Sequence, residues 1–270
     1  MNRLLIAGTA LIHRPGDGPA LVLLHGIGSD AESWLPLIAA LPPAVNVLAW
    51  WAPGYGASAP VAAEQPTPDA YAIRLAEVLY GMRLDRVALA GHSLGTIFAA
   101  RFAATWPERV AALALLSPAL GYRVAHGDPL PPAVQARIDD LEAQGPQAFA
   151  ETRAPRLVHA PATKPEVLRA VRRAMAAVKP GGYAQAVHAL GAGDLLGDAA
   201  RFARPALVAC GEEDLVTPPD NARRLHAALP AGSALHLVPG AGHALPQEEP
   251  AAIAALLAGM VAGLAGAAHA

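Results

Sequence analysis

The chain has 270 residues, of which 54% are hydrophobic and 16% are charged, so it is too apolar to be disordered and long enough to bury a large core. A formal net charge of −2 gives no electrostatic reason to expect nucleic-acid binding, and a small molecule is the expected partner. The single cysteine, Cys210, excludes an intramolecular disulfide framework and fits a reducing compartment; we expect it to be a small buried residue.

The N-terminal segment 1–13 combines a basic residue with an apolar run, as a signal peptide does. Gly8 and Thr9 interrupt this run and no small-residue cleavage site follows, so we expect two short strands and a cytoplasmic protein. No other segment has the roughly 18 continuous apolar residues that cross a bilayer. Three glycines break the alanine-rich segment 251–268, which is therefore predicted to be a helix packed on the core rather than a membrane anchor.

Short apolar segments alternate with helical ones in the first and last parts of the chain. Buried strands are predicted at 20–24, 46–50, 86–90, 110–116, 205–210 and 234–238. Helices are predicted at 31–41, 67–81, 93–105 and 219–228. Strands and helices alternating at this spacing indicate an α/β fold with a mostly parallel, doubly wound sheet.

The alternation lapses between residues 119 and 200, where only helical segments such as 133–144 and 164–178 are recognisable. A structureless loop of about 80 residues would be improbable inside a compact domain. We therefore predict a single domain over 1–270, with a core of 1–118 and 201–270 and a helical cap inserted at 119–200. Such a cap would lie over the strand ends and enclose a pocket.

Residues 91–95 read Gly-His-Ser-Leu-Gly and lie where a predicted apolar strand turns into an alanine-rich helix. This G-x-S-x-G pattern is typical of a nucleophile elbow, in which the turn strains the serine backbone and the glycines leave room around it. A glycine-bounded surface loop would not require that strand and helix. Ser93 is therefore the predicted nucleophile, presented where the helix directs its free N–H groups and its positive dipole end.

A serine hydroxyl needs a base, and histidine serves best near neutral pH. His243 lies in a glycine-rich loop after the last predicted strand, from which it can reach the carboxyl edge of the sheet. His92 is too close to Ser93 along the chain to face its hydroxyl, and His25 precedes a glycine turn, so structural roles are favoured for both. His243 is the predicted base, with a loop histidine of no catalytic role as the alternative.

An orienting carboxylate must hold the tautomer of that histidine and stabilise its charged form. Asp214 follows the preceding predicted strand and lies in the loop beside that of His243. Glu212 and Glu213 compete for this role, but Asp214 is favoured because it lies nearest the following helix. The chain order is then Ser, Asp, His, as in α/β-hydrolases.

With these residues the whole chain resembles the α/β-hydrolase fold superfamily, most specifically over 20–117 and 205–250. The matching motifs are H-G-x-G at 25–28, P-G-x-G-x-S at 53–58, G-H-S-L-G at 91–95, G-x-x-D-x-V-x-P at 211–218 and G-x-G-H at 240–243. The resemblance implies that the backbone N–H groups of Ile27 and Leu94 form an oxyanion hole. Small capped members that are similar include carboxylesterases, enol-lactonases, cofactor-free perhydrolases and C–C hydrolases of aromatic ring-cleavage products.

Two positions depart from patterns common in these relatives. Ala244 stands where C–C hydrolases generally have tryptophan directly after the catalytic histidine, which disfavours C–C cleavage. Trp51 stands where many relatives have aspartate, and its ring either narrows the pocket entrance or belongs to the core. We place Gly26, His92, Trp51 and Ala244 at the substrate pocket.

Basic residues outnumber acidic ones by seven to two between residues 151 and 180 of the predicted cap. The seven are Arg153, Arg156, Lys164, Arg169, Arg172, Arg173 and Lys179. This surplus could attract an acidic substrate, although such residues more often form a solvated helix face.

We expect a serine hydrolase that cleaves a small carboxylic ester or lactone through an acyl-enzyme intermediate. Two alternatives stay open: a C–C bond hydrolase of ring-cleavage products, and a non-catalytic small-molecule receptor of the same fold. The chain has no C-x-x-C or H-E-x-x-H pattern, so no metal and no organic cofactor are expected. We expect a monomer or a small homo-oligomer, with no nucleic-acid or membrane partner.

Overall fold

The computed structural model describes residues 1–267, with side chains as far as residue 264. Within these residues, eight strands form one sheet in the order β1-β2-β4-β3-β5-β6-β7-β8. The strands are β1 (Asn2–Ile6), β2 (Thr9–Arg14), β3 (Ala20–Leu24), β4 (Asn46–Trp50), β5 (Val87–His92), β6 (Val110–Leu116), β7 (Leu207–Gly211) and β8 (Ala234–Val238). β2 pairs antiparallel with β1 and with β4, whereas the other pairs are parallel. The mostly parallel sheet and the two N-terminal strands are confirmed.

The central strands are buried on both faces because their sequences are continuously apolar. Every residue of β3 and β5 is buried, as expected of parallel strands that helices cover on two sides. β1 lies at the edge of the sheet and is largely exposed. Because parallel strands end at the same edge, the loops after β3, β5, β7 and β8 lie together, and ligands of open α/β sheets bind there.

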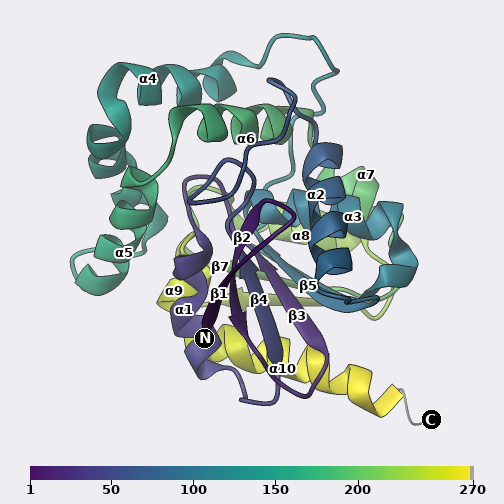
Figure 1. Ribbon diagram of the computed structural model, residues 1–270. Helices are drawn as coiled ribbons and strands as arrows, with labels where there is room; N and C mark the ends of the chain where they lie inside the picture. The colour runs from purple at the N-terminus through teal and green to yellow at the C-terminus, as the bar shows by residue number, and fades with distance from the viewer. Residues whose placement is uncertain (268–270) are drawn as a thin grey trace.

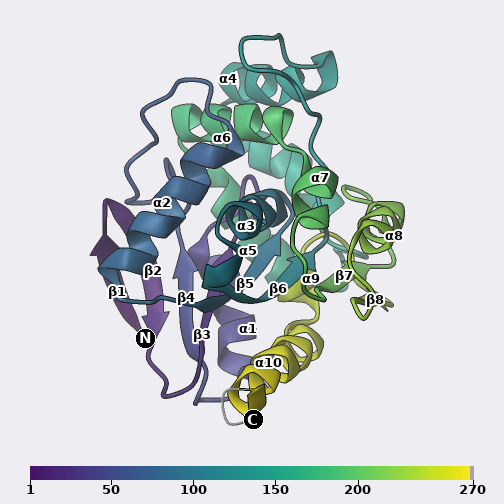
Figure 2. The same ribbon diagram turned by 90° about the vertical axis from the view of Figure 1, so that its right-hand side faces the viewer.

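Helices cover both faces of the sheet, which confirms the doubly wound architecture. In Figure 2, α1 (Leu35–Ala40) and α10 (Pro250–Ala267) lie below the sheet. Above it are α2 (Pro68–Gly81), α3 (Leu94–Thr105), α7 (Leu195–Ala200) and α8 (Pro219–Ala228). Residue 268, the predicted end of the last helix, lies outside the described residues. No helix in the described part of the chain combines the length and apolar character needed to cross a membrane.

Short helical turns connect several of these elements. They are η1 (Ala31–Trp34), η2 (Pro107–Arg109) and α9 (Leu245–Glu248). The predicted helix at 31–41 is therefore divided into the 3₁₀ turn η1 and the short helix α1.

The chain between β6 and β7 forms α4 (Pro132–Arg153), η3 (Ala154–Leu157), α5 (Pro165–Ala176), α6 (Pro180–Ala192) and α7. Figure 1 shows α4 and α6 above the sheet and α5 lower, to one side; we call these three helices, with η3, the cap. α7 returns to the core and packs on α3. α4 is bent at Gly145, whose φ of 72° and ψ of 161° are not helical and which precedes Pro146. Glycine adopts such a positive φ without a steric penalty, so the second half of α4 can fold back beside the first.

Candidate active site

Ser93 lies at the turn between β5 and α3, with a φ of 53° and a ψ of −117°. A positive φ is strained for serine, and strain of this kind costs on the order of 1–3 kcal/mol. The turn is tight: a Cβ atom added at Gly91 would lie 2.3 Å from the carbonyl oxygen of Gly95, and one at Gly95 would lie 2.0 Å from that of Leu24. This is the strand-to-helix geometry that the G-x-S-x-G pattern predicts.

The main chain holds this turn against the neighbouring strand. The N–H of Ser93 donates to the carbonyl oxygen of Leu116, at the end of β6, with an N–O distance of 2.9 Å. Leu94 is the first residue of α3, so its own N–H has no acceptor within the helix. That N–H is available to a negative charge placed beside Ser93.

Asp214 and His243 lie on adjacent loops, after β7 and β8, and their side chains are hydrogen-bonded. Nδ1 of His243 lies 2.9 Å from Oδ2 of Asp214, and both side chains are almost fully buried. Because a carboxylate only accepts hydrogen bonds, Nδ1 carries the ring proton and Nε2 is left as the basic nitrogen. Burial alone would raise the pKa of Asp214, but His243 and the N–H groups of Val216 and Thr217 hold it below its ordinary range.

Thr217 is a site residue that the sequence analysis missed. Its hydroxyl oxygen lies 3.0 Å from Oδ2 of Asp214, 3.1 Å from Nδ1 of His243 and 3.0 Å from the carbonyl oxygen of Ser117. It therefore fixes the Asp214–His243 pair to the end of β6. Its position just before two prolines and a helix indicates only a helix start, so the sequence carries no signal for this contact.

His25 and His92 both bond to the main chain, as their predicted structural roles require. Nε2 of His25 accepts from the N–H of Ala52 at 3.0 Å, and Nδ1 lies 2.8 Å from the carbonyl oxygen of Gly26. Nε2 of His92 lies 2.7 Å from the carbonyl oxygen of His243. Both rings thus hold loops at the edge of the sheet.

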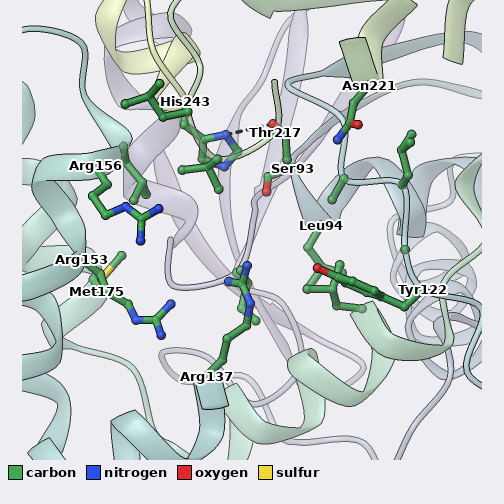
Figure 3. Close-up of a pocket in the computed structure, with 18 of the residues that line it drawn as sticks. Ser93, Leu94, Tyr122, Arg137, Arg153, Arg156, Met175, Thr217, Asn221 and His243 are labelled. Atoms are coloured by element: carbon green, nitrogen blue, oxygen red, sulfur yellow. Dashed lines mark hydrogen bonds between the residues drawn. The ribbon is translucent and has the colours of Figure 1, made fainter. Parts of the chain in front are cut away.

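A cavity of about 400 Å³, a usual size for a small-molecule site, opens beside Ser93. Ile27, Ser93, Leu94 and His243 all line it, and Figure 3 shows Ser93 and His243 on the same stretch of wall. No hydrogen bond joins the Ser93 hydroxyl to the imidazole among the described residues.

Comparison with known proteins assigns the fold. A sequence profile of the alpha/beta hydrolase fold matches residues 19–250. The chain belongs to this family. It is an α/β-hydrolase, as its motifs predicted.

Three named proteins illustrate what this α/β-hydrolase is similar to. A Shigella flexneri protein provisionally assigned as the carbamate hydrolase RutD is 29% identical over 252 residues, which cover 92% of this chain and 93% of the relative. The enol-lactonase from Burkholderia xenovorans LB400 has a TM-score of 0.83 and 26% identity, covering 97% of this chain and 100% of its own. A thermophilic esterase from Thermogutta terrifontis, at 24% identity, shares the fold with a TM-score of 0.86, covering 98% and 99% of the two chains.

Four residues were predicted to lie at the substrate pocket of this α/β-hydrolase, and none of them lines the cavity. They are Gly26, His92, Trp51 and Ala244. Gly26 lies behind Ser93, where an added Cβ would be 2.8 Å from the serine Cβ. The Trp51 ring packs against Gly56, and the Arg3 guanidinium lies over it. These contacts keep the ring away from the cavity. The position of a residue after a strand does not fix the direction of its side chain. Packing against neighbouring groups sets that direction here.

Ala244 is enclosed by the cap. Its side chain is 3% exposed and packs in a small cluster with Ala154, Val158 and Val171. Its N–H donates to the carbonyl oxygen of Leu157 at 2.7 Å. A tryptophan at this position would collide with the cap residues.

The surplus of basic residues in segment 151–180 is divided between two places. Arg153 and Arg156 line the cavity. The other five contact carboxylates or carbonyl oxygens elsewhere, and these are Lys164, Arg169, Arg172, Arg173 and Lys179. Arg137 and Arg224, which the sequence analysis did not single out, also line the cavity. Within the described residues, no group of three or more His, Cys, Asp or Glu side chains is arranged to hold a metal ion.

Proposed function

We propose that this α/β-hydrolase is a serine hydrolase that cleaves a small carboxylic ester or lactone through an acyl-enzyme intermediate. The observation that carries the proposal is the buried hydrogen bond from Nδ1 of His243 to Asp214, with the ring and Ser93 on one cavity wall. This bond leaves Nε2 unprotonated and stabilises the imidazolium that forms when the ring takes a proton.

The reaction proceeds in two stages. The Ser93 oxygen attacks the carbonyl carbon while its proton moves to Nε2 of His243, and the tetrahedral intermediate then expels the alcohol, which takes that proton. Water next attacks the acyl-serine ester, again giving its proton to Nε2, and the acid is released with Ser93 restored. One ester and one water become one acid and one alcohol; from a lactone, both groups remain in one hydroxy acid.

Backbone N–H groups of Ile27 and Leu94 stabilise the oxyanion in this scheme. Both residues line the cavity, and Leu94 opens a helix whose positive dipole end faces Ser93. Loss of one such donor typically lowers the rate by about 10²–10³. The carbamate hydrolase and the enol-lactonase named above act, by their names, on a carbonyl carbon bonded to a heteroatom, which supports the same chemistry here.

The test is hydrolysis of p-nitrophenyl butyrate and of a simple lactone by the wild type and by Ser93→Ala. Removal of a triad serine costs about 10⁶ in rate, so we expect the variant to fall to background. Ser29→Ala, a serine outside the cavity lining, should retain wild-type turnover. A fluorophosphonate should label Ser93 in a one-to-one ratio.

Retained turnover in Ser93→Ala, or labelling mapped to another residue, would overturn the proposal. Turnover of a ring-cleavage dienone without turnover of esters would instead identify a C–C hydrolase. Tight ligand binding without any turnover would identify a receptor.

A further inference from the structure

Four arginines line the cavity beside Ser93: Arg137, Arg153, Arg156 and Arg224. No aspartate or glutamate is among the described residues that line it. The wall therefore carries four positive charges and no negative one, and a cavity lined by one sign of charge attracts a ligand of the opposite sign.

The bend in α4 at Gly145 brings Arg153 to the wall that Arg137 also lines. The second half of the helix folds back, so that Arg153 reaches Asp140 in the first half and forms an ion pair at 2.7 Å. The Arg153 guanidinium also lies over the Phe149 ring, 4.7 Å from its centre. Both contacts hold the Arg153 head on the same wall as Arg137. Figure 3 shows the heads of Arg137, Arg153 and Arg156 directed towards the centre of the cavity.

Only Arg153 is neutralised by the protein. Within the described residues, Arg137, Arg156 and Arg224 make no ion pair with any carboxylate. Arg137 is half-buried, whereas Arg156 and Arg224 are exposed, so Arg137 lies deeper than the other two. A half-buried charge that lacks a carboxylate partner is stabilised more by a bound anion than an exposed charge is.

The charges of these arginines affect the pKa of the neighbouring Tyr183 hydroxyl. Burial raises the pKa of the Tyr183 hydroxyl, and Arg137 and Arg153 act against that effect because they stabilise a nearby negative charge. The same field would stabilise a carboxylate bound at this place.

We propose that the substrate carries a carboxylate in addition to the carbonyl that Ser93 attacks, and that Arg137 binds it, beside the Arg153–Asp140 ion pair. The substrate class is a half-ester or lactone of a dicarboxylic acid, or an ester whose alcohol part bears the acid. Arg156 and Arg224 lie at the exposed part of the wall and attract the anion before it binds. The inference rests on the proposed function for its reaction, and its binding step can be tested separately.

Two matched pairs of esters test the proposal and locate the anion. The first pair differs by a carboxylate in the acyl part: mono-p-nitrophenyl glutarate is charged and methyl p-nitrophenyl glutarate is neutral. The second pair differs by a carboxylate in the alcohol part: m-carboxyphenyl butyrate is charged and phenyl butyrate is neutral. We expect one charged ester to exceed its neutral counterpart at least about tenfold in kcat/KM, with the preference shrinking at high salt. The preferred pair identifies the part that bears the anion.

Arg137→Gln should lower kcat/KM for the preferred charged ester about 10- to 100-fold, and lower it far less for the neutral counterpart. Arg137→Lys should recover part of the loss, because it keeps the charge but not the two-pronged hydrogen bonding. Arg169→Gln removes a charge from α5 outside the cavity and should change neither value. Thermal unfolding of each variant shows whether the cap remains folded.

Titration of glutarate and of uncharged glutaramide into Ser93→Ala tests the binding site without turnover. We expect glutarate to bind at least about tenfold more tightly, and Arg137→Gln in that background to remove the difference. Serine-dependent hydrolysis with no charge preference, or equal losses for both members of a pair in Arg137→Gln, would overturn this inference while leaving the proposed function intact. Glutarate selectivity without hydrolysis would overturn the proposed function and retain the anion site.

Discussion

The imidazole of His92 donates a hydrogen bond from Nε2 to the main-chain carbonyl oxygen of His243 at 2.7 Å, although 151 positions separate the two residues. The His92 ring also lies edge-on to Trp34, with their centres 6.2 Å apart. The residue next to the proposed nucleophile therefore holds the loop that carries the proposed base. Burial, together with the neighbouring His243 ring, lowers the pKa of His92 to about 3.

This pKa makes stability fall in mild acid. Between about pH 3 and 6.5 the unfolded His92 binds a proton that the folded ring does not, so the free energy of unfolding decreases as the pH falls. One such group contributes about 1.4 kcal/mol per pH unit, or about 2 kcal/mol between pH 6.5 and 5. Guanidinium unfolding of the wild type and of His92→Asn at pH 7 and 5 measures this difference.

His126, which is exposed, supplies the control. His126→Asn should lose as much stability between the two pH values as the wild type, whereas His92→Asn should lose about 2 kcal/mol less. Equal losses in all three proteins would show that His92 titrates normally in the folded state.

Asp214→Asn should lower kcat on the order of 10⁴, the loss seen when an amide replaces a triad aspartate and favours the wrong histidine tautomer. Glu213→Gln, at the competing neighbour, should have little effect because His243 bonds to Asp214. Steady-state kinetics on p-nitrophenyl butyrate measure both. A larger loss at Glu213 than at Asp214 would transfer the orienting role to Glu213.

Glu248 joins the cap to the His243 loop. Its carboxylate has no solvent exposure and accepts from Nζ of Lys164 at 2.9 Å and from the N–H groups of His159 and Gly242, each at 3.0 Å. Glu248→Gln keeps the shape but removes the charge, so we expect a loss of about 2 kcal/mol of unfolding free energy and a lower kcat.

Glu249→Gln is the matched control for that change. The Glu249 carboxylate is 38% exposed and lies 4.0 Å from Nζ of Lys164, so its loss should cost less than about 0.5 kcal/mol. Chemical unfolding measures both variants. Similar costs for the two would mean that the buried contacts of Glu248 do not hold the cap to the loop.

Two glycine-to-alanine changes in helices should have opposite signs. At Gly95 the added Cβ would lie 2.0 Å from the carbonyl oxygen of Leu24, so α3 must move from β3, at a cost of about 3 kcal/mol or more. At Gly181 in α6 nothing lies within 4 Å, and alanine should stabilise by roughly 0.5–1 kcal/mol. Thermal unfolding measures both, and a stabilising Gly95→Ala would show that the elbow is not tightly packed.

Elements with local signals were predicted closely. The helix at 219–228 and the strands at 46–50, 110–116 and 234–238 have the predicted bounds, since proline, glycine and apolar runs mark their ends in the sequence itself. The helices α6 and α7 were missed because alanine and glycine dominate them and leave little amphipathic pattern.

The sequence alone determined the fold class, the family motifs and the placement of Ser93, Asp214 and His243 after predicted strands in that chain order, because strand periodicity and turn chemistry are local properties. Only the tertiary structure decided which side chains face the cavity. Arg137 of α4 and Arg224 of α8 lie far apart in the chain and meet at one cavity, whereas Trp51 and Ala244 turn away because neighbouring groups pack against them. Side-chain direction depends on contacts between segments far apart in the chain, and no local pattern encodes those contacts.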